Sequence, residues 1–312
     1  MPKLSVSAVL WTLLYVVVWG GSIAVLSQSG DDSASEAMVI GPIFGLIAPL
    51  LAWGLTAFGR RETSPVPVAR PGVETAAVLG YLAVYALLFL GWGLSAVREW
   101  FPQDPEREFA ISGLKLLAHV VLPATLLAVL GARISPLLKA NAGRLTFWAP
   151  LLVLGPALLG LLAVVSPSLS VINDLKLSSS AWLWAAPGTF LWLVLAVGLC
   201  EEFLFRAVLL SRLTAFLKSA TGAVVIGAIL FGLAHAPGLW LRAEPGEFGH
   251  FQDPLFVFAY TVAVLSPTGI FFGVLWARTR SLWLLVLLHV AIDFLPNLPR
   301  FVHSFGTVFT GG

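Results

Sequence analysis

Cysteine and charged residues are scarce in this 312-residue chain. Its one cysteine, Cys200, allows neither an intramolecular disulfide nor a cluster of thiolate ligands. Only 11% of the residues are Asp, Glu, Lys or Arg, against about 25% in an ordinary soluble domain. The basic residues are scattered along the chain, whereas a nucleic-acid-binding face needs them clustered. The sequence therefore excludes a disulfide framework, a thiolate metal cluster and nucleic acid as the main partner.

Hydrophobic residues, by contrast, make up 58% of the chain, and the mean hydropathy is +0.93. A helix needs roughly 20 mostly apolar residues to cross a bilayer. Nine such runs are present, at residues 5–26, 39–58, 76–97, 110–131, 145–167, 181–210, 220–236, 255–275 and 281–296. We therefore predict an all-α, polytopic transmembrane helix bundle of about 8 to 9 spans, with membrane lipid as its surroundings.

The basic residues between these runs indicate an orientation. Eleven lie on the side of the N-terminus: Lys3, Arg60, Arg61, Arg70, Arg133, Lys139, Arg144, Arg212, Lys218, Arg278 and Arg280. Five lie on the other side: Arg98, Arg107, Lys176, Arg242 and Arg300. Because cytoplasmic loops carry the excess of Lys and Arg, the N-terminus is expected in the cytoplasm. The short loops fit a prokaryotic inner membrane.

Six ionisable groups interrupt the apolar runs in the last third of the chain: Glu201, Glu202, Arg206, His235, His289 and Asp293. A charged group near the centre of a bilayer costs about 2.5 to 3.5 kcal/mol on insertion scales, so such groups face the bundle interior and mark functional sites. Counting about 1.5 Å per residue from the basic residues at the cytoplasmic face places these carboxylates and histidines about 14 to 25 Å deep. A single buried site is consistent with that spread.

The spacing of these groups assigns them different roles. Glu202 and Arg206 are four residues apart, so they share one helix face and can neutralise each other as a brace. Glu201 is rotated by about 100° from Glu202 and is left for chemistry. His289 and Asp293 are again four apart, and the carboxylate would orient the imidazole or share its site.

Two further histidines receive simpler interpretations. His235 is expected at a helix end, because Pro237 follows closely and proline disfavours helix before it. His119 is interpreted as a core residue whose ring nitrogens have hydrogen-bond partners. Lys115 is interpreted as a side chain that extends to the external membrane–water interface.

These spacings resemble the CAAX prenyl protease and bacteriocin-processing family of intramembrane proteases, which includes the type II CAAX endopeptidases. The similar motifs are Glu201-Glu202-x-x-x-Arg206 to EExxxR, Phe231-x-x-x-His235 to FxxxH, and His289-x-x-x-Asp293 to HxxxN/D. The resemblance implies a protease core over residues 181–297, after N-terminal transmembrane helices of unassigned role (1–180) and before a C-terminal tail (298–312). Asp293 stands where many members have Asn.

The resemblance implies an intramembrane endopeptidase, similar to CAAX prenyl protease 2, that cuts a membrane-associated or prenylated peptide. In such an enzyme Glu201 and His235 would hold and activate a water, while His289 and Asp293 would position the carbonyl or stabilise its oxyanion. Glu202, Arg206 and Phe231 would be structural.

Other interpretations of the same residues stay open. Glu201, His235 and His289 could instead bind a catalytic zinc ion, although a mechanism without metal or other cofactor is favoured. A proton-coupled membrane carrier also uses buried carboxylates and histidines. A non-catalytic immunity or scaffold protein of the same fold is the third possibility.

Overall fold

The computed structural model describes residues 5–30, 32–59, 66–242 and 253–310. Within these ranges every regular element is helical and no strand is present. The elements, with η marking π-helical stretches and the 3-10 turn η4, are α1 Val6–Leu26, α2 Ser33–Pro42, η1 Ile43–Ile47, α3 Ala48–Leu55, α4 Pro71–Val84, η2 Tyr85–Gly93, α5 Leu94–Trp100, α6 Glu106–Leu116, η3 Leu117–Val121, α7 Leu122–Val129, η4 Ser135–Leu138, α8 Leu145–Val165, α9 Ser168–Asp174, α10 Ser179–Leu193, η5 Val194–Gly198, α11 Leu199–Glu201, η6 Glu202–Leu210, α12 Ser211–Leu217, α13 Ala220–Leu233, α14 Ala236–Arg242, α15 Pro254–Tyr260, η7 Thr261–Leu265, α16 Ser266–Thr279 and α17 Leu282–Thr310.

Eight helical segments in the described ranges are long and apolar enough to cross a membrane: Val6–Leu26, Ser33–Leu55, Pro71–Trp100, Glu106–Val129, Leu145–Val165, Ala220–Leu241, Pro254–Thr279 and Leu282–Val308. A further unbroken helical stretch runs from α10 to α12, over residues 179–217. The predicted all-helical bundle of about eight or nine spans is therefore confirmed.

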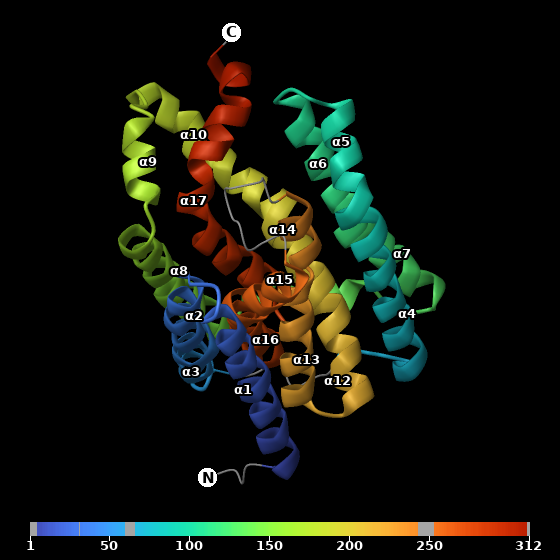
Figure 1. The fold of residues 1–312 in the computed structure, drawn as a ribbon. Coiled ribbons are helices and arrows are strands. Elements are labelled where there is room, and N and C mark those ends of the chain that lie inside the picture. The colour runs from blue at the N-terminus through green and yellow to red at the C-terminus, as the bar shows by residue number, and fades with distance from the viewer. Residues whose placement is uncertain (1–4, 31, 60–65, 243–252, 311–312) are drawn as a thin grey trace.

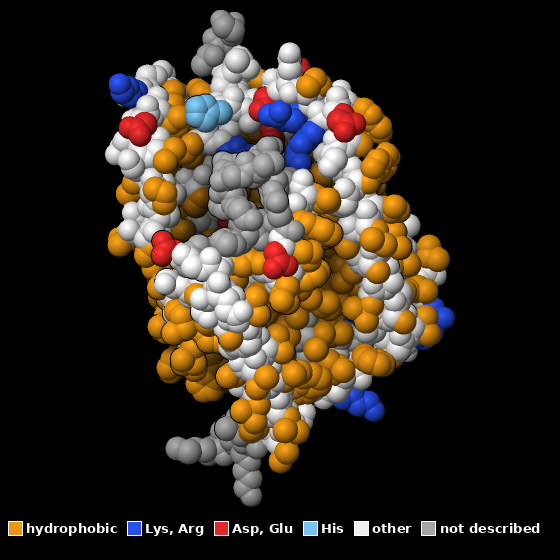
Figure 2. All heavy atoms as spheres, in the orientation of Figure 1, with side chains coloured by type: hydrophobic (Ala, Val, Ile, Leu, Met, Phe, Trp, Pro, Cys, Tyr) orange, Lys and Arg blue, Asp and Glu red, His pale blue; other side chains and the backbone are white. Residues whose placement is uncertain are grey.

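The loops lie in two sets at opposite ends of the bundle, and the two termini also lie at opposite ends (Figure 1). At the end of the bundle where the N-terminus lies, the Leu282 amide donates to the Lys139 carbonyl oxygen and the Asn141 side chain donates to the Thr279 carbonyl oxygen. At the other end Arg300 pairs with Glu108. Apolar side chains cover the middle of the face drawn in Figure 2. Among the basic residues used for the orientation, Lys3, Arg60, Arg61 and the side chain of Arg242 lie outside the described residues.

The centre of the bundle is formed by the last third of the chain. In the segment Pro254–Thr279, 72% of the most apolar window is buried inside the protein, against 6% in Val6–Leu26. The latter segment therefore leaves most of its apolar surface for lipid, while α13, α16, α17 and η6 pack on one another. A charged group on these central elements is enclosed by protein, as intramembrane charges require.

Several elements differ in detail from the expectations. The last helix does not end near residue 296 but continues to Thr310. Arg212, interpreted as a marker of the membrane surface, is instead fully buried and lies 3.3 Å from Glu74 of α4. The Glu74 carboxylate also accepts hydrogen bonds from the Ala69 and Arg70 amides at the start of α4. A cation with a buried counter-ion can lie in the interior, which spacing along the sequence does not reveal.

Candidate active site

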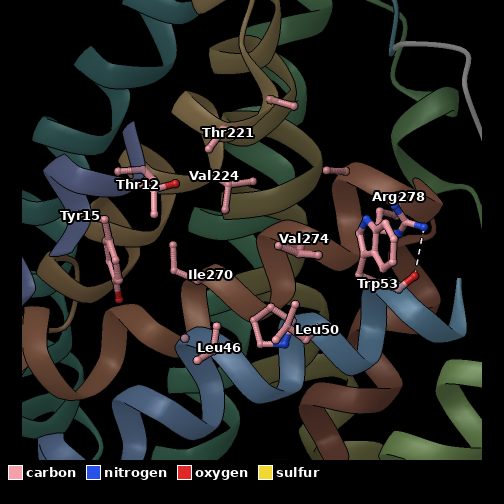
Figure 3. Close-up of a pocket in the computed structure, with 15 residues that line it drawn as sticks. Thr12, Tyr15, Leu46, Leu50, Trp53, Thr221, Val224, Ile270, Val274 and Arg278 are labelled. Atoms are coloured by element: carbon pink, nitrogen blue, oxygen red, sulfur yellow. Dashed lines mark hydrogen bonds between the residues drawn. The ribbon is translucent and has the colours of Figure 1, made fainter. Parts of the chain in front are cut away.

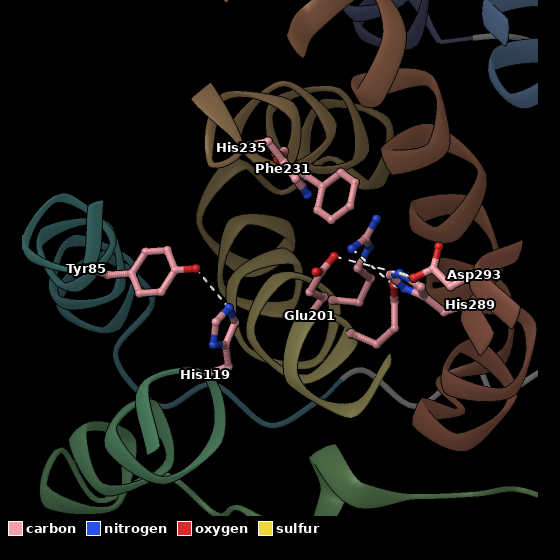
Figure 4. Close-up of polar contacts among 9 residues, drawn as sticks. Tyr85, His119, Glu201, Phe231, His235, His289 and Asp293 are labelled. Atoms are coloured by element: carbon pink, nitrogen blue, oxygen red, sulfur yellow. Dashed lines mark hydrogen bonds and ion pairs between the residues drawn. The ribbon is translucent and has the colours of Figure 1, made fainter. Parts of the chain in front are cut away.

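His289 is the centre of a buried ionic cluster (Figure 4). Its Nδ1 donates a 2.7 Å hydrogen bond to Oε1 of Glu202. Its Nε2 lies 3.4 Å from Oδ2 of Asp293 and 3.8 Å from Oε2 of Glu201. Residues almost ninety positions apart in the chain thus meet at one imidazole, and the structure brings four of the predicted site residues together.

The predicted pair between Glu202 and Arg206 is present, with 3.2 Å between Oε1 and Nη1. The Arg206 guanidinium lies over the ring of Phe231, 4.1 Å from its centroid, and 5.3 Å from the centroid of Phe272. Aromatic faces attract cations most strongly where water is excluded. Sequence reasoning did not identify the hydrogen bond from His289 to Glu202, which makes this carboxylate the closest partner of the imidazole as well as of the guanidinium.

His235 reaches the cluster from the end of α13, which stops at Leu233 before α14 begins at Ala236. Its Nδ1 donates a 2.8 Å hydrogen bond to the Phe231 carbonyl oxygen, because a carbonyl can only accept. The other ring nitrogen is then left for a ligand or water. His235 interacts electrostatically with Glu201. Because Phe231 and His235 are one helical turn apart, Phe231 contacts both groups: its ring lies under the Arg206 guanidinium and its carbonyl oxygen holds the His235 imidazole.

Accessibility separates the two adjacent glutamates. The Glu201 side chain keeps 15% of its surface exposed and that of Asp293 keeps 27%. Glu202 is fully enclosed, and Arg206 exposes 3%. Glu201 and Asp293 can therefore meet a substrate or water, whereas Glu202 and Arg206 hold the helices in place.

Close helix contacts set this geometry. A Cβ on Gly198 would lie 3.1 Å from the Val286 carbonyl oxygen, so this glycine lets η5 approach α17 and brings the following glutamates to His289. The ring of Phe272 on α16 stacks on His289 with 5.2 Å between centroids. The π-helical stretch η6 begins at Glu202, and such stretches are frequent at functional sites.

His119 and Tyr85 lie beside the cluster, from helices outside the last third of the chain. His119 is buried as expected, and its Nδ1 donates to the Lys115 carbonyl oxygen at 2.9 Å. Its Nε2 then accepts from the Tyr85 hydroxyl, also at 2.9 Å. Both side chains interact electrostatically with Glu201, which Figure 4 draws between this pair and the pair of His289 and Asp293. No motif pointed to this contact.

The zinc alternative requires donor side chains that converge on one point. Zinc needs three or four converging ligands. In the part of the chain that the structure describes, no three His, Cys, Asp or Glu side chains are grouped so that they could hold a metal ion. Glu201, His235 and His289 are near one another, and the His289 Nδ1 is bonded to Glu202, which leaves its Nε2 toward Glu201 and Asp293. Cys200 is buried, with its thiol on the Leu195 carbonyl oxygen.

Three hollows lie at different places around the described bundle. An apolar pocket of about 710 Å³ lies between α1, α3, α13 and α16, with Trp53 and Arg278 at one end (Figure 3), and none of the seven motif residues lines it. An apolar pocket of about 310 Å³ lies against Ala236, directly after His235. A polar pocket of about 190 Å³ is bounded by Asp293. The polar pocket therefore adjoins the cluster, and the smaller apolar pocket begins one residue after His235.

These observations define an integral, multi-pass membrane protein with a cluster of Glu, His, Arg and Asp side chains in its interior. Residues 182–295 match the family model described as type II CAAX prenyl endopeptidase Rce1-like. The match covers the part of the chain that carries the three motifs, which confirms the resemblance noted from them and supports an intramembrane protease function. No curated protein and no solved structure matches the chain.

Proposed function

We propose that the protein is an intramembrane endopeptidase in which Glu201 activates the attacking water. The observation that carries this proposal is the contrast between two neighbouring carboxylates. Glu201 is accessible and faces His289 and His235, whereas Glu202 is sealed between Arg206 and His289. A base must reach the water from which it takes a proton, and an enclosed carboxylate that is paired with a cation does not.

The proposed reaction uses the cluster in two steps. Glu201 takes a proton from a water that His235 helps to hold, and the water oxygen attacks the peptide carbonyl carbon. His289, held by Glu202 and flanked by Asp293, positions the carbonyl and stabilises the oxyanion that forms. The Glu201 carboxyl group then gives the proton to the leaving nitrogen as the carbon–nitrogen bond breaks, which restores the carboxylate.

The mechanism is proposed without a metal ion. Its support is that no three His, Cys, Asp or Glu side chains of the described residues are grouped so that they could hold a metal ion. One nitrogen of each imidazole is bonded within the protein, to Glu202 in His289 and to a carbonyl oxygen in His235, and the other nitrogen is left for water or substrate. These bonds fix the rings in orientations that suit hydrogen bonding to water and carbonyl oxygen.

The substrate is proposed to be a membrane-associated peptide, and a prenylated one is the case that the family description implies. The apolar pocket of about 310 Å³ is lined by Leu87 of η2, Trp240 of α14 and Phe258 of α15, and it begins next to His235. An apolar segment or lipid chain placed there would lead the peptide toward the cluster. This pocket supports the membrane-associated substrate and does not discriminate between prenyl and other apolar groups.

Orientation and source belong to the same proposal. The excess of basic residues on the side of the N-terminus favours a cytoplasmic position for that side, and the short loops favour a prokaryotic cell. The test fuses two reporter enzymes to each terminus in turn, one that is active only in the cytoplasm and one that is active only outside it. At the N-terminus we expect only the cytoplasmic reporter to be active.

The test compares new peptide amino termini in membranes that hold equal amounts of wild type or Glu201→Gln. The amide keeps the shape of the side chain and removes the base. We expect a defined set of cuts in wild type that is absent from the variant. Glu106→Gln serves as the matched control, because this glutamate is exposed at the start of α6, and its cuts should equal those of wild type.

The same termini in wild type and in Glu201→Gln, with substrate present, would contradict the proposal. Proton-coupled transport and scaffold binding would then be the functions to measure.

A further inference from the structure

The polar pocket beside Asp293 carries more positive than negative charge. It has a volume of about 190 Å³, and its charged lining groups are Arg98, Lys115, Arg300, Glu108 and Asp293. They come from α5, α6 and α17, so the pocket lies where the N-terminal helices meet the matched domain. It is at the end of the bundle where the C-terminus lies, and Figure 2 shows Lys and Arg side chains gathered at that end.

Both acids of the pocket already have partners. Glu108 lies 2.6 Å from Arg300, and Asp293 faces the imidazole of the cluster. The side chains of Arg98 and Lys115 make no hydrogen bond or ion pair within the described ranges, and Arg98 is close enough to Arg300 for the two guanidinium groups to repel each other. Glu108 attracts Arg98, but this carboxylate is already paired with Arg300, and Lys115 has only the more distant attraction of Glu201. Two acids thus serve three half-buried cations, so an anion in this pocket would be stabilised.

A third donor faces the same space. The Trp192 indole donates to the Ser112 hydroxyl oxygen at 3.2 Å, and both residues line the pocket. Since that oxygen accepts from the indole, the Ser112 hydroxyl hydrogen is left to donate. Guanidinium, ammonium and hydroxyl donors around one small space are suited to an oxyanion with two or more acceptor atoms.

We infer that this pocket is a subsite for a carboxylate of the peptide substrate. The inference rests on the proposed function and names the group that the enzyme would recognise beside the bond it cuts. A peptide carries its negative charge on carboxylates, at its C-terminus or on Asp and Glu side chains. Because Asp293 bounds both the pocket and the cluster, a carboxylate held there would fix the peptide's position relative to Glu201 and His289.

The experiment uses synthetic peptides that span a cut site found in the comparison of amino termini. Each peptide is made with a free or an amidated C-terminus, and with its acidic side chains present or replaced by the corresponding amides. The full-length protein is assayed in detergent or lipid vesicles, and the readout is the ratio of kcat/KM for the carboxylate form over the amide form. This ratio is insensitive to a general loss of activity.

In wild type we expect the ratio to be about tenfold or more, as for a lost charge-assisted hydrogen bond. In Arg98→Gln it should fall close to one, and Arg98→Lys should retain part of it. Arg107→Gln is the matched control, because Arg107 lies at the same end, pairs with Asp104 at 2.7 Å and does not line the pocket. The control should keep the wild-type ratio.

The two peptide series identify the source of the carboxylate: a ratio that depends only on the C-terminus indicates the terminal group, and one that depends on the side chains indicates an acidic residue. Equal cleavage of carboxylate and amide forms by wild type overturns the subsite. An unchanged ratio in Arg98→Gln, or an equal fall for both peptide forms as expected for a lipid headgroup, also overturns it.

Failure of the proposed function looks different in this assay. In that case wild type would cut no peptide that Glu201→Gln leaves intact. If wild type cuts and Glu201→Gln does not, the endopeptidase stands and only the ratios decide on the carboxylate subsite.

Discussion

We expect that replacing Glu202 lowers the stability of the protein, whereas replacing the adjacent Glu201 lowers its peptide-cleaving activity. In Glu202→Gln the amide oxygen can still accept from His289, but the negative charge beside the buried Arg206 is lost. Breaking a buried ion pair by removing one partner costs about 3 to 5 kcal/mol, because the other charge remains without compensation. We therefore expect the free energy of unfolding to fall by that amount.

Glu201→Gln should leave the fold intact. Glu201 keeps 15% of its surface exposed, and its nearest His289 contact is 3.8 Å, longer than a hydrogen bond. Replacing the carboxylate removes its attraction to the surrounding histidines and Lys115 but also its desolvation cost, so the loss of stability should be smaller than in Glu202→Gln. Peptide cleavage, in contrast, should fall by about 10² to 10⁴, the usual contribution of a positioned general base.

The assay is unfolding in mixed micelles, followed by tryptophan fluorescence, with cleavage measured on the same preparations. Glu106→Gln controls for the exchange of a carboxylate for an amide at an exposed position. A stable Glu202→Gln together with a strongly destabilised Glu201→Gln would mean that the roles of the two carboxylates are reversed, and would refute the reasoning.

Three further predictions concern the helices around the site. Gly198→Ala places a Cβ 3.1 Å from a carbonyl oxygen of α17, so η5 must shift, and we expect a loss of about 1 to 3 kcal/mol in unfolding free energy and a lower kcat in the cleavage assay. Glu74→Gln leaves the enclosed Arg212 without its counter-ion and should destabilise the protein by about 3 to 5 kcal/mol in the micelle assay. Glu74→Gln combined with Arg212→Met should recover most of that loss. A double variant no more stable than the single one would contradict the ion pair. Phe231→Leu removes the ring face under Arg206, and we expect the free energy of unfolding to fall by about 1 to 2 kcal/mol beyond the loss of packing. In a double-mutant cycle the same substitution should cost less when Arg206 is already replaced by Met.

The N-terminal helices contribute to the site although they lie outside the matched domain. Tyr85 and His119 form a hydrogen-bonded pair beside Glu201, and Lys115 lines the pocket that Asp293 bounds. The region of unassigned role therefore supplies one wall of the cluster. Its side chains are the first place to look for differences in substrate among proteins that share the three motifs.

The sequence alone determined the class of fold and most of the cluster. In lipid, the backbone N–H and C=O groups of a single long apolar run find partners within the run only when it is a helix, so composition predicted the helical bundle. A charge within such a run must face protein, which predicted the interior position of Glu201, Glu202, Arg206 and Asp293. Spacing of four residues also predicted the pair of Glu202 and Arg206, because both partners lie on one helix.

Only the tertiary structure decided which groups on different helices meet. The bond from His289 to Glu202, the stacking of Phe272 on that imidazole and the burial of Arg212 against Glu74 all join residues more than fifteen positions apart. Helical periodicity fixes the direction of a side chain around its own axis but not which neighbouring helix it faces. That depends on close contacts such as the approach of η5 to α17 at Gly198, and on packing that no local pattern encodes.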